Sequence, residues 1–118
     1  MKLYLTRHGE TEWNRQNRVL GRTDIPLNKT GLQQAEATAK YLAGRAINLI
    51  YTSPLSRAVM TGRIIAAEQD EKCTCVVRDC LIEQDFGVFE GVDRGDVRYQ
   101  REKRLFSRNT KMGNLIWM

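Results

Sequence analysis

Short apolar runs alternate with segments of helical apolar spacing along this chain, and this alternation restricts its fold more than any other feature. Residues 2–6, 47–52 and 73–78 have the alternating or β-branched character of strands. Between them, residues 31–44 and 54–69 carry apolar side chains at the intervals of amphipathic helices. The order strand, helix, strand, helix, strand predicts an α/β fold, with a parallel sheet, flanking helices and right-handed crossovers.

The ends of the two expected helices are marked by residues that start or stop helices. Thr30 is the expected N-cap of the first helix and Gly44 its stop, while Pro54 suits the first position of the second. We expect the first helix to face the core with Leu32, Ala35, Ala39 and Leu42, and the second with Ala58 and Ile65.

Functional groups in a parallel sheet gather beyond the carboxyl ends of its strands. Here three segments follow the expected strands: the loop of residues 7–29, the turn of residues 53–57 and the loop of residues 81–91. The first is long and rich in Gly, Asn, Arg and Asp, and a loop of that length in a compact domain is usually functional.

The first loop begins with Arg7, His8 and Gly9. A lone histidine is more often structural than catalytic. A histidine beside an arginine at the end of a strand, however, can attack a phosphorus atom that the guanidinium holds. Gly9 would let the backbone approach such a ligand closely. We therefore expect His8 to be a nucleophile.

The other two segments each add a charged residue suited to phosphate chemistry. Arg57 lies one turn into the second helix, where it can bind further phosphoryl oxygens, although a solvated helix face is the alternative. Glu83, with Asp85 and Glu90 nearby, can donate a proton to a leaving oxygen and later take one from water. The alternative for Glu83 is a surface acid on a loop.

Four motifs in this order resemble those of the histidine phosphatase superfamily, which includes the cofactor-dependent phosphoglycerate mutases. They are RHGETEWN at 7–14, GRTDIPL at 21–27 with TGLQQA at 30–35, SPLSRA at 53–58, and LIEQDFG at 81–87 with FEG at 89–91. Four ordered motifs together make a specific signal. The resemblance implies a phosphoglycerate mutase-like fold, incomplete on its C-terminal side.

The resemblance also implies a role for each matching residue. His8 becomes a phosphohistidine and Glu83 is the proton donor. Arg7, Asn14 and Arg57 bind the phosphoryl group of a small phosphorylated metabolite. No metal and no cofactor is implied, because two arginines supply the charge stabilisation that a cation gives elsewhere.

The resemblance ends near Gly91. We therefore divide the chain into residues 1–91, the N-terminal part of a histidine phosphatase domain, and residues 92–118, a divergent basic tail. The tail carries a net charge of +4, from 7 Lys and Arg against 3 Asp and Glu, out of +5 for the chain. We expect a truncated or frameshifted product. The alternative is a specialised short member that binds phosphorylated ligands or pairs with another chain.

The family has a second histidine, in a His-Gly motif on a later strand, whereas the single histidine of this sequence is His8. We therefore expect phosphomonoester hydrolysis, or phosphoryl transfer, to be impaired. Residues 86–91 look more like the phosphatase branch, such as the α-ribazole phosphatases, than the mutases. A non-catalytic phosphate-binding remnant or interaction module is the alternative, and a phosphoglycerate mutase is the second alternative.

The remaining features concern location and partners. No apolar run reaches the ~18 residues of a membrane span, and the start lacks a signal-peptide cleavage site, so we expect a cytoplasmic protein without a membrane partner. The tail's basic residues form no compact cluster, which argues against nucleic acid. A sheet that lacks a neighbouring strand exposes an edge, from which we expect self-association.

Overall fold

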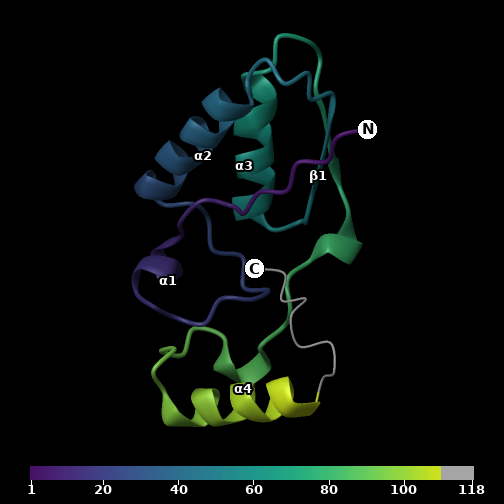
Figure 1. The fold of residues 1–118 in the computed structure, drawn as a ribbon. Helices are drawn as coiled ribbons and strands as arrows, with labels where there is room; N and C mark the ends of the chain where they lie inside the picture. Colours follow the sequence, from purple (N-terminus) through teal and green to yellow (C-terminus); the bar gives the residue numbers. More distant parts are fainter. Residues whose placement is uncertain (110–118) are drawn as a thin grey trace. The chain divides into compact units, whose positions relative to one another are not determined.

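The computed structural model describes the backbone of residues 1–109 and side chains as far as residue 105 (Figure 1). The chain divides into two compact units. The first contains Met1–Glu12 and Asp24–Ile82, and the second contains Trp13–Thr23 and the described residues from Glu83 onward.

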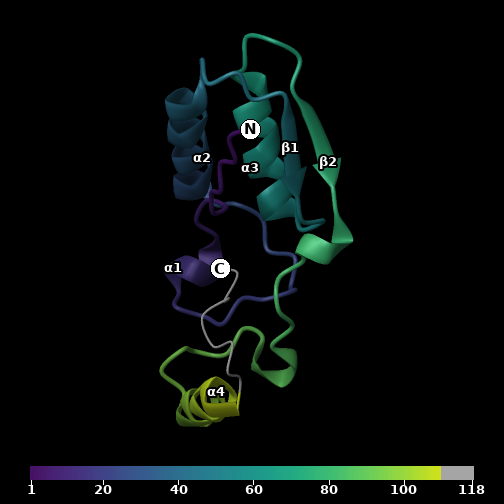
Figure 2. The ribbon, with the colours of Figure 1, turned by 45° about the vertical axis from the view of Figure 1, so that its right-hand side comes forward.

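The first unit contains a parallel sheet with helices packed beside it, which confirms the predicted fold class. The sheet pairs β1 (Leu49–Thr52) with β2 (Thr74–Val77). The helix α3 (Ser56–Ala67) contacts both strands, and α2 (Lys29–Leu42) packs on α3, as Figure 2 shows. A 3₁₀ turn, Asp79–Leu81, follows β2.

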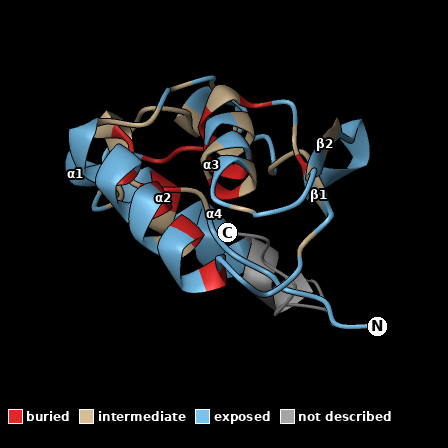
Figure 3. Ribbon diagram, turned by 90° about the horizontal axis from the view of Figure 1, so that it is seen from above, coloured by how far each residue is buried: buried red, intermediate tan, exposed pale blue. Residues whose placement is uncertain are grey.

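The core of this unit lies between the helices and the sheet. Ala39 and Leu42 of α2 and Ile65 of α3 are buried together, and three isoleucines pack against them: Ile47, Ile50 and Ile64. Figure 3 shows buried positions along α2 and α3. Ala35 is also buried, as predicted, whereas Leu32 is exposed and Ala58 only half-buried.

The prediction of a strand at residues 2–6 was wrong. These residues form no strand in the structure, and Leu3 and Leu5 are 88% and 81% exposed. A strand needs a hydrogen-bonded neighbour to satisfy its backbone groups. Among the described residues, the ladder joins β1 to β2 and does not extend to residues 2–6.

Several element ends also differ from the prediction. The N-cap of α2 is Asn28 rather than Thr30, because the Asn28 side chain accepts a hydrogen bond from the Gly31 amide at 2.8 Å. The helix α3 begins two residues after Pro54, since Leu55 keeps an extended backbone. Each strand is two residues shorter than the apolar run that predicted it.

The assignment of Asn28 rather than Thr30 as the N-cap of α2 gives a stability prediction. Asn28→Ala is expected to lower the free energy of unfolding by about 1 kcal/mol, the usual cost of a lost N-cap. Thr30→Ala, at an exposed position two residues further along, is expected to change it by less than about 0.5 kcal/mol. Urea unfolding of the two variants measures both values. A larger loss for Thr30→Ala would contradict the assigned cap.

The second unit contains most of α1 (Glu12–Arg15), a 3₁₀ turn (Gly87–Phe89) and α4 (Val97–Asn109). The anchor of α4 is Tyr99, which is only 5% exposed. Its ring lies 6.4 Å from that of Phe86 and 5.9 Å from that of Phe89, measured between centroids. An aromatic cluster of this kind stabilises the packing of a helix through the apolar area it buries and through edge contacts between rings.

The helix α4 has no predicted counterpart in the sequence pattern. Most of its described side chains are charged and exposed, so the sequence has no apolar stripe there that would predict a helix. Its start is stabilised by Asp96, whose carboxylate accepts hydrogen bonds from the amides of Arg98 and Tyr99. The residues at the very end of the chain, Leu115–Met118, lie outside the described part. Within that part, no helix combines the length and apolar character needed to cross a membrane.

Candidate functional site

His8 lies in the loop that precedes α1, with a half-buried side chain. Its Nδ1 is 2.7 Å from the carbonyl oxygen of Gly9. Because a carbonyl oxygen can only accept a hydrogen bond, Nδ1 carries the proton and donates it there. Nε2 is then left with its lone pair, which is the form of imidazole that can act as a nucleophile.

Burial lowers the pKa of His8 below its usual value of 6.5. The hydrogen bond to the Gly9 carbonyl opposes this shift, while the positive charges of Arg57 and Arg7 add to it. The imidazole is therefore mostly neutral near neutral pH.

The backbone next to His8 is hydrogen-bonded to α3 through Thr61, a buried residue that belongs to none of the four sequence motifs. The Gly9 amide donates to Thr61 Oγ1 at 3.4 Å, and this hydroxyl donates to the Arg57 carbonyl at 2.7 Å. A threonine hydroxyl commonly bonds the carbonyl four residues earlier in a helix, so the sequence gives no special signal for this contact.

The same loop is also held against the start of α2. The Glu10 amide donates to Gln34 Oε1 at 2.8 Å. Asn28 donates twice to Glu10, from its backbone amide to the carbonyl and from Nδ2 to the carboxylate, each at 3.0 Å. Gly31 lies so close to Glu10 that a Cβ there would meet its carbonyl oxygen at 2.0 Å. These contacts fix the backbone that carries His8.

Arg57 lies in the first turn of α3 and is only 2% exposed. The alternative of a solvated helix face is therefore wrong for this residue. A buried guanidinium needs anionic or carbonyl partners, and its charge is close enough to act on the pKa of His8. Arg7 is exposed. The first unit thus brings together three of the five predicted site residues: Arg7, His8 and Arg57.

The other two, Asn14 and Glu83, belong to the second unit. Asn14 lies in α1 and is half-buried. Glu83 is also half-buried; its carbonyl accepts from Arg22 Nε at 2.9 Å, and its carboxylate accepts from the Gln84 amide at 3.0 Å. Their roles toward His8 stay predictions.

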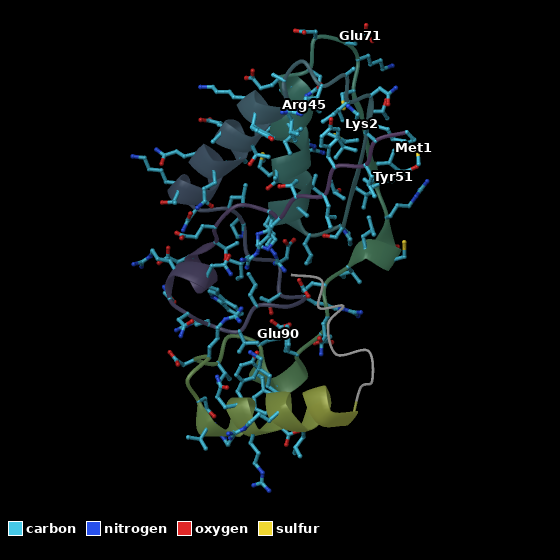
Figure 4. All side chains as sticks on the ribbon, viewed as in Figure 1. Met1, Lys2, Arg45, Tyr51, Glu71 and Glu90 are labelled. Carbon is cyan, nitrogen blue, oxygen red and sulfur yellow. The ribbon has the colours of Figure 1, made fainter. Side chains whose placement is uncertain are left out.

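Two further acids near Glu83 have structural partners. Glu90, labelled in Figure 4, accepts from the amides of Gly21 and Arg22 at 3.0 and 2.8 Å and from the Thr23 hydroxyl at 3.1 Å. It thereby organises the segment around residues 21–23. Asp85 accepts from the Gly87 amide at 2.8 Å. In the part of the chain that the structure describes, no three His, Cys, Asp or Glu side chains form a group that could hold a metal.

Comparison with known families classifies the chain. The family model of the histidine phosphatase superfamily (branch 1) matches residues 3–114. The chain belongs to this superfamily. The match continues past Gly91 into residues that showed no resemblance by inspection, and the division of the chain at that point stays a prediction.

Individual relatives include phosphatases and mutases. The uncharacterized phosphatase PhoE of Bacillus subtilis is 44% identical over 75% of this chain and 45% of its own length. A 2,3-bisphosphoglycerate-dependent phosphoglycerate mutase of Staphylococcus epidermidis is 35% identical over 82% of this chain and 44% of its own. The crystal structure of an Entamoeba histolytica phosphoserine phosphatase in complex with 3-phosphoglyceric acid superimposes with a TM-score of 0.69. That enzyme is 36% identical over 86% of this chain and 50% of its own. The chain thus spans about half the length of these relatives.

Proposed function

We propose that this histidine phosphatase chain hydrolyses small phosphomonoesters through a phosphohistidine on His8. The observation that carries the proposal is the state of His8. Its imidazole donates from Nδ1 to a carbonyl, keeps a lone pair on Nε2 and has a pKa lowered by burial and by two arginines. Such a group is a nucleophile suited to an anionic phosphoryl group that the same arginines attract.

In the first step, Nε2 of His8 attacks the phosphorus atom, a nitrogen–phosphorus bond forms and the ester oxygen–phosphorus bond breaks. The leaving oxygen takes a proton from Glu83. Arg7 and Arg57 neutralise the charge on the phosphoryl oxygens, and Asn14 donates a further hydrogen bond.

In the second step, water attacks the phosphohistidine and gives its proton to the Glu83 carboxylate. The nitrogen–phosphorus bond breaks, inorganic phosphate leaves and His8 regains its lone pair. The chain holds one histidine, so the second histidine of the family is not available to this step. We expect slow turnover, since the loss of one stabilising group typically lowers a rate by ~10²–10³-fold.

The substrate class follows from the family rather than from a pocket. We assign the phosphatase branch on the FG and FEG sequences at residues 86–91, and the PhoE relative supports this choice. Mutase activity is the second candidate, favoured by the relative from Staphylococcus epidermidis. Cytoplasmic location and self-association through exposed apolar residues such as Tyr51 remain parts of the proposal.

The pH dependence of p-nitrophenyl phosphate hydrolysis tests the proposal. Protonation of His8 removes the Nε2 lone pair, and its pKa is lowered, so the neutral form persists to more acidic pH. Activity is expected to stay level through neutral pH and to fall on the acid side, with an apparent pKa below 6.5. An acid limb centred above that value would contradict the proposed nucleophile. Phosphate binding without any turnover would favour the non-catalytic module.

A further inference from the structure

The start of α3, the helix that carries Arg57, is capped by a residue from a distant segment. The N-cap position itself is Leu55, whose side chain makes no capping hydrogen bond. Instead Asp24, 32 residues earlier, accepts from the Ser56 amide at 2.8 Å and from the Ser56 hydroxyl at 2.7 Å. A carboxylate at this position satisfies an otherwise unpaired helix amide and interacts favourably with the helix dipole.

The charge state of Asp24 agrees with this role. The hydrogen bonds from the Ser56 hydroxyl and amide lower its pKa, and the positive charge of Arg57 lowers it further. Asp24 is therefore a carboxylate at neutral pH, directly beside the residue that precedes Arg57 in the chain.

The first turn of α3 is thus held at two points. Asp24 fixes Ser56, just before Arg57. Thr61, one turn later, bonds the Arg57 carbonyl and receives the Gly9 amide. The second tie leads to the loop that carries His8, so the placement of Arg57 relative to His8 depends on how firmly this turn is held.

We propose that Asp24 is a positioning residue for Arg57, which it holds in the orientation that binds a phosphoryl group. The inference rests on the proposed function, in which Arg57 contacts that group. Asp24 itself touches neither the substrate nor His8 in this scheme. It acts by fixing the turn, because a small misplacement of a binding group is costly when the geometry is set by one rigid element.

A simpler role would be stability alone. In that case, loss of Asp24 would make the chain easier to unfold, but the folded protein would bind phosphate as before. If Asp24 positions Arg57, loss of Asp24 would lower the affinity of the folded protein for phosphate. This loss of affinity would occur only while Arg57 is present.

The experiment is a ³¹P NMR titration of the full chain with inorganic phosphate. Asp24→Ala is expected to weaken binding by up to ~100-fold. Asp24→Asn is expected to restore most of the affinity, because its amide oxygen still accepts both hydrogen bonds. In an Arg57→Ala background, Asp24→Ala is expected to have no further effect. Asp70→Ala, an exposed acid in the loop between α3 and β2, is the matched control and should bind like the wild type.

If Asp24→Ala does not fold, Ser56→Ala takes its place. This variant loses one of the two hydrogen bonds and should weaken binding by a smaller factor, again only when Arg57 is present. Equal weakening with and without Arg57 overturns the inference. So does unchanged affinity in every Asp24 and Ser56 variant while Arg57→Ala weakens binding; the proposed function then survives. A wild type that binds no phosphate overturns the inference and the proposed function together.

Discussion

His8→Ala is expected to reduce the rate of p-nitrophenyl phosphate hydrolysis by more than ~10³-fold, to about the rate without protein. The side chain that this change removes supplies the only proposed bond to phosphorus. Arg7 and Arg57 remain, so the variant keeps groups that bind a phosphoryl anion but has none that can accept it covalently. Steady-state rates of the two proteins at equal concentration measure the effect.

Two controls separate lost chemistry from lost structure. Far-ultraviolet circular dichroism should be unchanged, because within the described residues the His8 side chain hydrogen-bonds the neighbouring Gly9 carbonyl and no distant group. Inorganic phosphate should still bind. Equal hydrolysis by His8→Ala and the wild type would show that the turnover does not pass through a phosphohistidine, and the binding-module alternative would then be preferred.

The sequence predicted the first unit well where local pattern and tertiary contacts agree. The apolar spacing of residues 31–44 and 54–69 predicted two helices, and α2 and α3 lie there because both bury most of that face. Residues 2–6 have an equally good strand pattern but no partner strand among the described residues. The local pattern indicates that a segment can form a strand, whereas pairing requires a neighbouring strand from another part of the chain.

The candidate site was predictable to a similar extent. Motif and residue chemistry pointed to His8, Arg7 and Arg57, which lie in one unit. The residues that hold these side chains in place were not predicted from motifs or residue chemistry. Thr61 accepts a hydrogen bond from the Gly9 amide, 52 residues earlier, and Asp24 accepts two from the amide and hydroxyl of Ser56, 32 residues later. Nothing in residue type or local spacing marks such a contact. The helix α4 was not predicted for another reason: a single buried tyrosine, Tyr99, packs it in place, and the rest of the segment is largely charged.

The close approach between the His8 loop and α2 is expected to make Gly31→Ala one of the most destabilising single changes in this chain. A Cβ at Gly31 would lie 2.0 Å from the Glu10 carbonyl oxygen, and one at Gly9 would lie 2.3 Å from the Gly31 carbonyl oxygen. Both obstacles are backbone atoms, so no side-chain rotation relieves the clash. The loop and the helix would have to separate.

We expect Gly31→Ala to lower the free energy of unfolding by about 3 kcal/mol, the upper end of the usual cost of overpacking. Separation would also weaken the Glu10 hydrogen bonds to Asn28 and Gln34, and so loosen the backbone beside His8. Urea unfolding measures the loss, with Thr30→Ala in the same turn as the control. A loss below about 1 kcal/mol, the typical cost of any substitution, would mean that the loop does not lie against α2, and the rigid support inferred for His8 would have to come from Thr61 alone.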